Sequence, residues 1–142
     1  MCLNAQEGLK KVVFDLTIGD LKEFEQRVLI GIVKYKDYYQ SNMQELDVAV
    51  VIHGDAYKFF VKDLSKSPYK NEIDLISARE SLEKRLRSSV DNYHVKFYIC
   101  QAGMNHLKIA NDNIYDFVTP VAMATVGLID QQNDGYAYMP IR

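Results

Sequence analysis

The sequence predicts an α/β fold built on a mostly parallel sheet that helices cover on both faces. Three observations lead to this prediction. Short apolar runs alternate with longer segments of helical periodicity. The apolar runs are nearly continuous, which is typical of strands buried on both faces. No repeat, low-complexity tract or Pro/Gly-rich linker divides the 142 residues, and this length falls in the commonest range for one domain.

The first strand is predicted over residues 11–16, an apolar run that a short turn follows. In that turn, Asp20 and Glu23 have the spacing of a capping box, so a helix is predicted to begin there and to run over residues 21–40. Leu29, Ile30 and Val33 lie outside the main apolar stripe of this helix. A helix this widely apolar buries a second face, which predicts contact with another subunit.

The rest of the chain continues the alternation. Further strands are predicted at residues 46–52, 95–99, 117–123 and 136–141. The intervening helices are predicted at residues 56–64, 75–86, 101–111 and 124–133. The fourth strand has the weakest pattern, because Pro120 removes a hydrogen-bond donor. Gly135 follows the last helix and suits a left-handed cap.

Composition excludes several classes of protein. The net charge is -2, the pI is about 5.9 and no basic patch stands out, so nothing favours nucleic-acid binding. The apolar runs are far shorter than a membrane span. Two cysteines do not make a disulfide framework, which favours a reducing, cytoplasmic location. The nucleotide-binding and zinc-protease motifs are absent, and no His or Cys pair has zinc spacing, so neither cofactor nor metal is predicted.

Residues 1–9 are predicted to be a flexible N-terminus, and residues 10–142 a single domain. The N-terminal segment could also be the remnant of a secretory signal. Ala5 suits a cleavage site whereas Leu3 does not. On that alternative the protein is periplasmic.

Cys100 is the leading candidate for chemistry. It closes the third predicted strand and precedes a helix, and in open α/β sheets ligands gather at this edge. The N–H groups of a helix start favour thiolate over thiol. The alternative is a small buried hydrophobe, since free cysteines are often buried.

His53 ends the second strand at the same edge. A cysteine–histidine pair would give an activated nucleophile; the alternative is a histidine that caps or hydrogen-bonds a loop. Gly54 suggests a turn with positive φ or backbone close to a ligand. Gly19 and Asp20 could bind a ligand, with helix capping as the alternative for Asp20. Tyr138 is a packing residue with a wet hydroxyl or a ligand contact.

Four landmarks carry a family resemblance. They are the strand 11–16 with Gly19-Asp20, the strand end Val50 to Gly54, the strand 95–99 with Cys100, and the ending Gln132-Asn133-Asp134-Gly135-Tyr136-Ala137-Tyr138. By their order and spacing, the chain resembles the DsrE/DsrF-like family of sulfur-relay proteins over nearly its whole length.

The resemblance implies a three-layer α/β/α fold of flavodoxin/Rossmann-like topology around a five-stranded, mostly parallel sheet. It also implies a homo-oligomer, and a cysteine that carries sulfur as a persulfide; by position this cysteine is Cys100. Many relatives have a Gly-Asn-Thr-like stretch after the cysteine, where this chain has Gln101-Ala102-Gly103-Met104. Gln101 is therefore expected to border an altered pocket beside the sulfur.

The expected function is that of a sulfur carrier or sulfurtransferase that exchanges sulfur with partner proteins or small thiols, with no metal and no organic cofactor. The alternative is a non-enzymatic, oligomeric small-ligand-binding or scaffold module in which Cys100 is inert. A nucleotide or flavin binder ranks below both, because phosphate-loop signals are absent.

Overall fold

The computed structural model describes residues 8–142. Cys2 and the segment considered as a signal remnant therefore lie outside the described residues. Five strands form one sheet in the order β4-β3-β2-β1-β5. They are β1 (Leu9–Leu16), β2 (Glu45–Ile52), β3 (Lys96–Cys100), β4 (Val118–Val121) and β5 (Ala137–Ile141). Every pairing is parallel, so the predicted α/β fold class and its five strands are confirmed.

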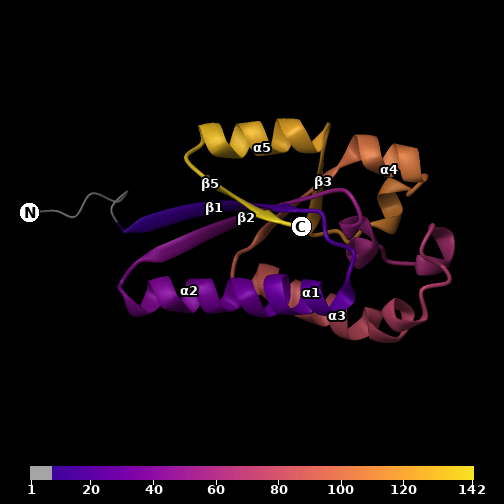
Figure 1. The fold of residues 1–142 in the computed structure, drawn as a ribbon, viewed down its shortest axis with the longest axis horizontal. Helices are drawn as coiled ribbons and strands as arrows, with labels where there is room; N and C mark the ends of the chain where they lie inside the picture. The colour runs from indigo at the N-terminus through magenta and orange to yellow at the C-terminus, as the bar shows by residue number, and fades with distance from the viewer. Residues whose placement is uncertain (1–7) are drawn as a thin grey trace, which may run out of the picture.

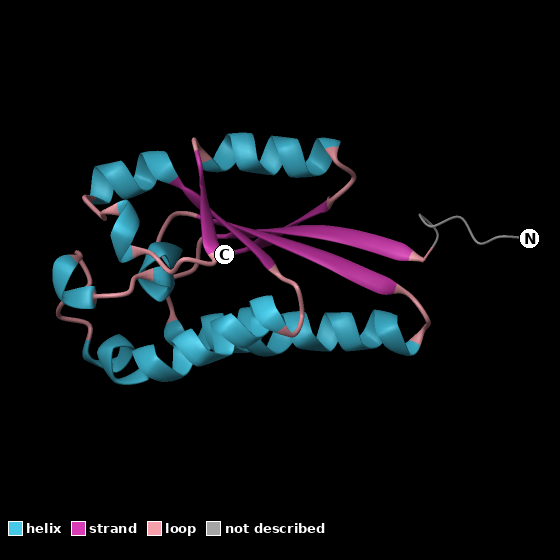
Figure 2. Ribbon diagram, turned by 180° about the vertical axis from the view of Figure 1, so that it is seen from behind, coloured by secondary structure: helices cyan, strands magenta, loops and turns pink. Residues whose placement is uncertain are grey.

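Helices lie on both faces of the sheet, as Figures 1 and 2 show. On one face lie α1 (Leu21–Phe24), the π-helical η1 (Glu25–Ile30), α2 (Gly31–Ser41) and α3 (Ile73–Asp91). On the other face lie α4 (Gln101–Leu107) and α5 (Ala124–Asn133). Short 3-10 segments complete the chain: η2 (Ala56–Phe60), η3 (Leu64–Lys66) and η4 (Asn111–Asn113).

Alternation along the strands decides which side chains meet which helices. The ring of Phe14 lies 6.0 Å from that of Tyr35 in α2, so the next residue, Asp15, faces the α4 and α5 layer. Val51 pairs with Asp15 across β1 and β2, and lies against Gly127 of α5. This layer therefore covers the face of the sheet that carries Asp15.

The first long helix differs from the predicted one in a way that moves its side chains. The N–H of Gly31 bonds to the carbonyl of Gln26, five residues earlier, in a π-helical turn. Such a turn holds more residues than an α-turn and rotates the rest of the helix about its axis. Leu29, predicted to lie outside the core stripe, is only 6% exposed and belongs to the core, whereas Ile30 is 36% exposed. The expectation that Leu29 adds outer apolar surface is therefore wrong.

Other boundaries differ locally. β1 begins at Leu9, before the predicted start at Lys11, and so includes a residue of the segment predicted to be flexible. The prediction of one helix over 56–64 is wrong: η2 covers only Ala56–Phe60, and η3 begins at Leu64. The ring of Phe59 stacks on that of Phe24, with 4.1 Å between the ring centroids. The helix predicted to end near Asn111 ends at Leu107, because Lys108 adopts a left-handed conformation with φ of 58°.

Candidate functional site

Cys100 lies at the carboxyl end of the sheet. It is the last residue of β3, and α4 begins at the next residue. β3 has β2 on one side and β4 on the other, so the residue is interior to the sheet. Its side chain is buried, with 8% of the residue exposed. The topology therefore places the thiol of Cys100 at the edge of the sheet where neighbouring strands end and α4 begins.

Four hydrogen-bond donors lower the pKa of the Cys100 thiol: the backbone N–H groups of Gly103, Ala124 and Ala102 and the hydroxyl of Tyr57. Ala102 and Gly103 lie in the first turn of α4, and Ala124 is the first residue of α5, so two helix starts converge on the sulfur. Burial raises the pKa of the thiol, but these hydrogen bonds, that of Gly103 foremost, hold the pKa below its ordinary value. The surroundings thus favour thiolate.

Tyr57 reaches this position from η2, and its hydroxyl also lies 3.0 Å from the carbonyl oxygen of Cys100, to which it donates. Only 2% of the residue is exposed. Burial, followed by the hydrogen bond to Cys100, raises the pKa of Tyr57 far above neutrality. The phenol therefore stays protonated and acts as a donor.

His53 follows β2 at the same edge. Ile52 pairs with Ile99 in the register of β2 and β3, so His53 and Cys100 each come directly after a paired residue. The sequence suggests a pair between them, but the hydrogen bond of the imidazole goes elsewhere. His53 Nε2 lies 2.5 Å from Asp15 Oδ1.

Asp15 is hydrogen-bonded to two residues of the predicted site, His53 and Tyr138. The hydroxyl of Tyr138 donates to its second oxygen, Oδ2, at 2.5 Å. Tyr138, Asp15 and His53 belong to β5, β1 and the end of β2, which are consecutive in the sheet. With Cys100 at the end of β3, four neighbouring strands contribute one polar or nucleophilic side chain each. The hydrogen bond to Asp15 raises the pKa of Tyr138.

Sequence reasoning missed Asp15, Tyr57 and Gly103. Asp15 carried a signal, because it is a single charged residue near the end of the apolar run 11–16. A carboxylate buried among apolar residues needs hydrogen-bond partners. Tyr57 and Gly103 carried no such signal, since their roles depend on contacts between segments far apart in the chain.

Three residues predicted to bind a ligand, Gly19, Asp20 and Gly54, lie in the loops that follow β1 and β2. Each of them contacts other parts of the protein. Asp20 caps α1, with Oδ2 accepting from the N–H of Glu23 at 2.9 Å. Gly19 packs closely on Asp55, whose Cβ lies 2.7 Å from the place of an added Cβ. Gly54 has a φ of +61°, and an added Cβ would lie 3.0 Å from that of Thr17. Close loop packing accounts for both glycines.

Gln101 is the first residue of α4. Its amide nitrogen donates to the side-chain oxygens of Asn105 and Asn111, at 2.9 and 2.8 Å. Asn111 donates in return to Gln101 Oε1 at 2.9 Å. This exposed amide cluster ties α4 to η4 beside the buried sulfur.

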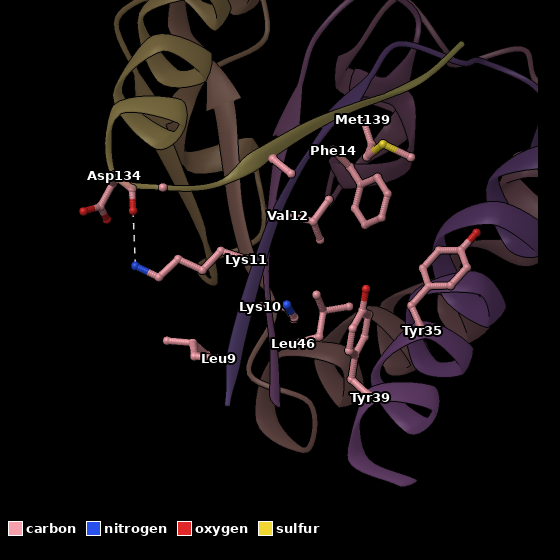
Figure 3. A pocket seen from close by; sticks show the side chains of 12 residues that line it. Leu9, Lys10, Lys11, Val12, Phe14, Tyr35, Tyr39, Leu46, Asp134 and Met139 are labelled. Atoms are coloured by element: carbon pink, nitrogen blue, oxygen red, sulfur yellow. Dashed lines mark hydrogen bonds between the residues drawn. The ribbon is translucent and has the colours of Figure 1, made fainter. Parts of the chain in front are cut away.

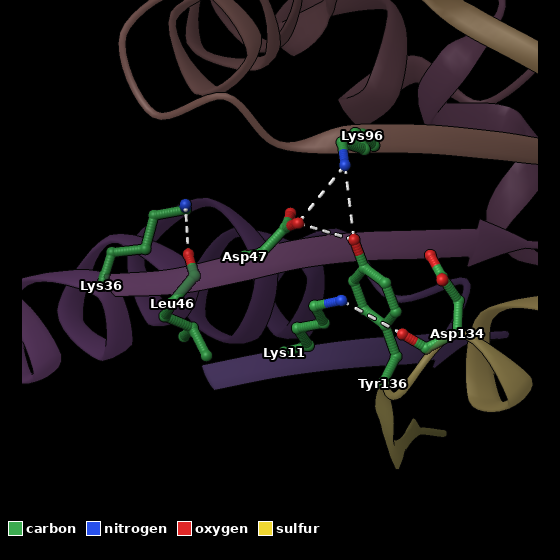
Figure 4. Close-up of polar contacts among 7 residues, drawn as sticks. All are labelled: Lys11, Lys36, Leu46, Asp47, Lys96, Asp134 and Tyr136. Atoms are coloured by element: carbon green, nitrogen blue, oxygen red, sulfur yellow. Dashed lines mark hydrogen bonds and ion pairs between the residues drawn. The ribbon is translucent and has the colours of Figure 1, made fainter. Parts of the chain in front are cut away.

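A second polar network lies at the amino end of the strands (Figure 4). The hydroxyl of Tyr136 donates to Asp47 Oδ2 at 2.6 Å, and Lys96 Nζ lies 3.3 Å from both oxygens. Burial, and then the hydrogen bond to Asp47, raise the pKa of Tyr136. This network links β2, β3 and the start of β5, away from Cys100.

A groove of about 860 Å³ opens near the same end of the sheet, between α2 and the strands (Figure 3). Its walls are mainly apolar and aromatic: Tyr35 of α2 faces Phe14 and Met139 across it, and Tyr39 lies beside Leu46. Its lining comes from β1, β2, β5, α2 and the turn before β5. It is therefore separate from the site around Cys100.

No group of three or more His, Cys, Asp or Glu within residues 8–142 is arranged to hold a metal ion. In the same residues, no helix combines the length and the apolar character that crossing a membrane requires.

Similarity to known proteins extends over most of the chain. Residues 11–141 match the DsrE/DsrF-like family. An uncharacterized protein of Aquifex aeolicus (strain VF5) is 28% identical over 130 residues, which are 92% of this chain and 55% of that relative. The chain therefore spans about half the length of this curated relative. The solved structure of a protein of unknown function from Methanobacterium thermoautotrophicum superposes with a TM-score of 0.60 at 18% identity, covering 92% of this chain and 98% of the other.

Proposed function

This chain belongs to the DsrE/DsrF-like family, which is associated with sulfur relay, and we propose that it carries sulfur on Cys100 as a persulfide. The observation that carries the proposal is the set of donors around the sulfur, which favours the nucleophilic thiolate. The place of Cys100 at the carboxyl end of a parallel sheet also supports it.

The reaction needs no external oxidant or reductant. The Cys100 thiolate attacks the outer sulfur of a donor R–S–SH. A bond forms between the two sulfurs, the donor S–S bond breaks, and R–S⁻ leaves, so the products are Cys100–S–SH and R–S⁻. Attack by an acceptor thiolate on the outer sulfur then regenerates Cys100 as thiolate. The N–H groups of Ala102, Gly103 and Ala124 stabilise the anion at each stage.

His53 is the acid–base group of this proposal. It lies at the same edge, and its ring is held by a carboxylate in the manner of an oriented base. It would protonate the departing R–S⁻ and take up a proton from the acceptor thiol. Tyr138 enters through its hydrogen bond to Asp15. Of the other candidates, Gln101 follows Cys100 at the start of α4, while Gly19, Asp20 and Gly54 shape the loops.

The test is intact mass spectrometry after incubation with a small persulfide donor. We expect a mass gain of one sulfur atom, about 32 Da, that a reductant reverses, as for other reversible thiol caps. The gain should be lost in Cys100→Ser and kept in Cys2→Ser, which serves as the matched control. A gain lost only in Cys2→Ser would place the sulfur on the other cysteine.

The second candidate is a binding or scaffold module with an inert Cys100, which the burial of this residue favours. It predicts slow alkylation at neutral pH and no mass gain with any of several donors. Fast alkylation with a mass gain rejects it.

We also propose that the protein forms a homo-oligomer in a reducing, cytoplasmic compartment, with small thiols or sulfur-relay proteins as donors and acceptors; a periplasmic location is the alternative. The surface that supports an oligomer keeps Ile30 from the expected one but not Leu29, which is buried. Ile30 of η1, Tyr38 of α2 and Met139 of the edge strand β5 are exposed.

A further inference from the structure

Tyr57 reaches Cys100 from a different segment than the backbone donors do. It belongs to η2, after the loop that contains His53 and Gly54, and its ring is buried. Its hydroxyl donates to the carbonyl oxygen of Cys100 at 3.0 Å, and as a hydrogen-bond donor it also lowers the pKa of the thiol of the same residue. A hydroxyl donates one hydrogen bond at a time.

Gly103 makes room for that hydroxyl. A Cβ added at Gly103 would lie 1.8 Å from the hydroxyl oxygen of Tyr57 and 2.6 Å from the ring carbon that bears it. Both atoms belong to a side chain that is buried and cannot swing away freely. Glycine weakens a helix interior relative to alanine, and α4 has only seven residues. A glycine at this position therefore has a packing reason, and that reason is Tyr57.

We propose that Tyr57 and Gly103 form a fitted pair that sets the reactivity of Cys100: the glycine admits the hydroxyl, and the hydroxyl turns from the carbonyl oxygen to the sulfur when the sulfur is anionic. A hydrogen bond to an ionised acceptor is stronger than one to a neutral carbonyl, so ionisation of the thiol draws the proton across. For the thiolate of Cys100, the inference rests on the contacts of Tyr57 and Gly103. For a persulfide on Cys100, it also rests on the proposed function.

The surroundings of Tyr57 keep it a donor rather than an acid. Burial, the hydrogen bond to Cys100 and the charge of Cys100 raise its pKa, and Tyr69 adds to this. The phenol thus stabilises the thiolate without neutralising it. It is well placed to do the same for a persulfide anion on Cys100, whose charge also lies beside the hydroxyl.

The test measures the rate of alkylation of Cys100 by iodoacetamide against pH, in a Cys2→Ser background so that a single thiol reports. We expect Tyr57→Phe to move the midpoint of the pH–rate profile upward by about one pH unit, since it removes one charge-assisted hydrogen bond. Tyr115→Phe is the control, because Tyr115 is equally buried but stacks on Phe117 at 5.2 Å, away from the cysteine.

Gly103→Ala should move the midpoint in the same direction, because the new methyl group displaces the hydroxyl. In the Tyr57→Phe background the ring must still move to admit the methyl group, but the same change should add little to the shift of the midpoint, since no hydroxyl remains to be lost. A Tyr57→Phe midpoint equal to that of the parent and of Tyr115→Phe overturns the pair, whether or not Gly103→Ala folds.

Sulfur loading of the same variants, followed by mass spectrometry, separates this inference from the proposed function. A shifted midpoint without a mass gain in the parent would keep the pair and reject sulfur carriage. A mass gain in the parent with an unshifted Tyr57→Phe midpoint would keep sulfur carriage and reject the pair.

Discussion

Asp15 accepts two hydrogen bonds of 2.5 Å, one at each carboxylate oxygen. The carboxylate is mostly buried, with 14% of its side chain exposed, so its charge acts at short range on His53 with little screening by water. In the proposed reaction, Nε2 of the imidazole would donate its proton to this charge and Nδ1 would be the nitrogen that exchanges protons. On that proposal Asp15 is a positioning residue for His53.

Replacing Asp15 by asparagine tests this role. Asp15→Asn keeps the shape but removes the charge and places an amide opposite the ring, so the imidazole loses its orientation. We expect the rate of sulfur loading on Cys100 to fall about tenfold or more, which is part of the roughly 10²–10⁴-fold that a positioned acid–base group contributes. Asp47→Asn is the matched control, because Asp47 also binds a tyrosine hydroxyl but lies at the amino end. Equal loading rates in both variants would contradict the role.

The lowered pKa of Cys100 also makes stability depend on pH. The pKa of this thiol is lower in the folded protein than in the unfolded chain, so the unfolded chain binds more protons between the two values. The free energy of unfolding should therefore rise with pH across that window, and the gain should be lost as pH falls through the folded pKa. Urea unfolding at several pH values below 9, with reductant present, measures it.

The comparison variant for that experiment is Cys100→Ser, which has no titrating thiol. The difference between the two proteins should grow as pH rises. Tyr57 and Tyr136 also have shifted pKa values, but both are raised from an ordinary value near 10, so neither titrates in this range. A difference that stays constant or shrinks would show that the thiol is not stabilised as an anion.

At the scale of elements, the sequence predicted those features that depend on local patterns of residues. Apolar runs and, for the last strand, an alternating pattern predicted all five strands, and Gly135 after the last helix has the positive φ, 94°, that its place suggested. The π-helical turn at Glu25–Ile30 was beyond prediction, because 3.6-residue periodicity assumes regular α-helical hydrogen bonds. The segment packs beside α3, where Arg85 lies 3.6 Å from Glu25, and tertiary contacts of this kind override local pattern.

The π-helical turn makes two adjacent apolar residues unequal. Leu29 is buried and Ile30 is half-exposed. We expect Leu29→Ala to lower the free energy of unfolding by about 2–5 kcal/mol, as for other core leucines, because it leaves a cavity. Ile30→Ala should change it by about 0.5 kcal/mol or less, as for most surface positions. Chemical denaturation of both variants measures this, and similar costs would mean that the turn does not rotate Leu29 inward.

At the scale of the whole molecule, the order of the strands assembles the site. Cys100, His53, Asp15 and Tyr138 come from β3, β2, β1 and β5, which neighbour one another in that order. Sequence reasoning placed Cys100 and His53 at strand ends, but the strand order that brings Tyr138 to Asp15 depends on pairing between residues 123 positions apart. Local patterns carry no information about such pairing, and the resemblance supplied a fold without these contacts.

The edge strand β5 is the feature of the whole molecule that bears on assembly. The carbonyl of Ile141 bonds to the N–H of Thr17 beyond β1, so the peptide groups of Tyr138 and Pro140 point away from the sheet. Proline has no N–H, so the outer side of this short edge strand offers few hydrogen-bond donors. This limits non-specific pairing of β5 with strands of other molecules. Met139, 53% exposed, and the tyrosines of α2 present apolar surface beside it.

We expect a stable homo-oligomer at micromolar concentration, held through this apolar surface. Static light scattering should give a multiple of the 16.4 kDa chain mass. Met139→Lys should lower the measured mass, because it places a charge in the contact, as charges on edge strands do in proteins that avoid association. Met43→Lys is the control, since Met43 is more exposed still but lies in the turn between α2 and β2. Monomer mass for the parent protein would reject the oligomer. A mass unchanged by Met139→Lys but lowered by Met43→Lys would place the contact at the other end of α2.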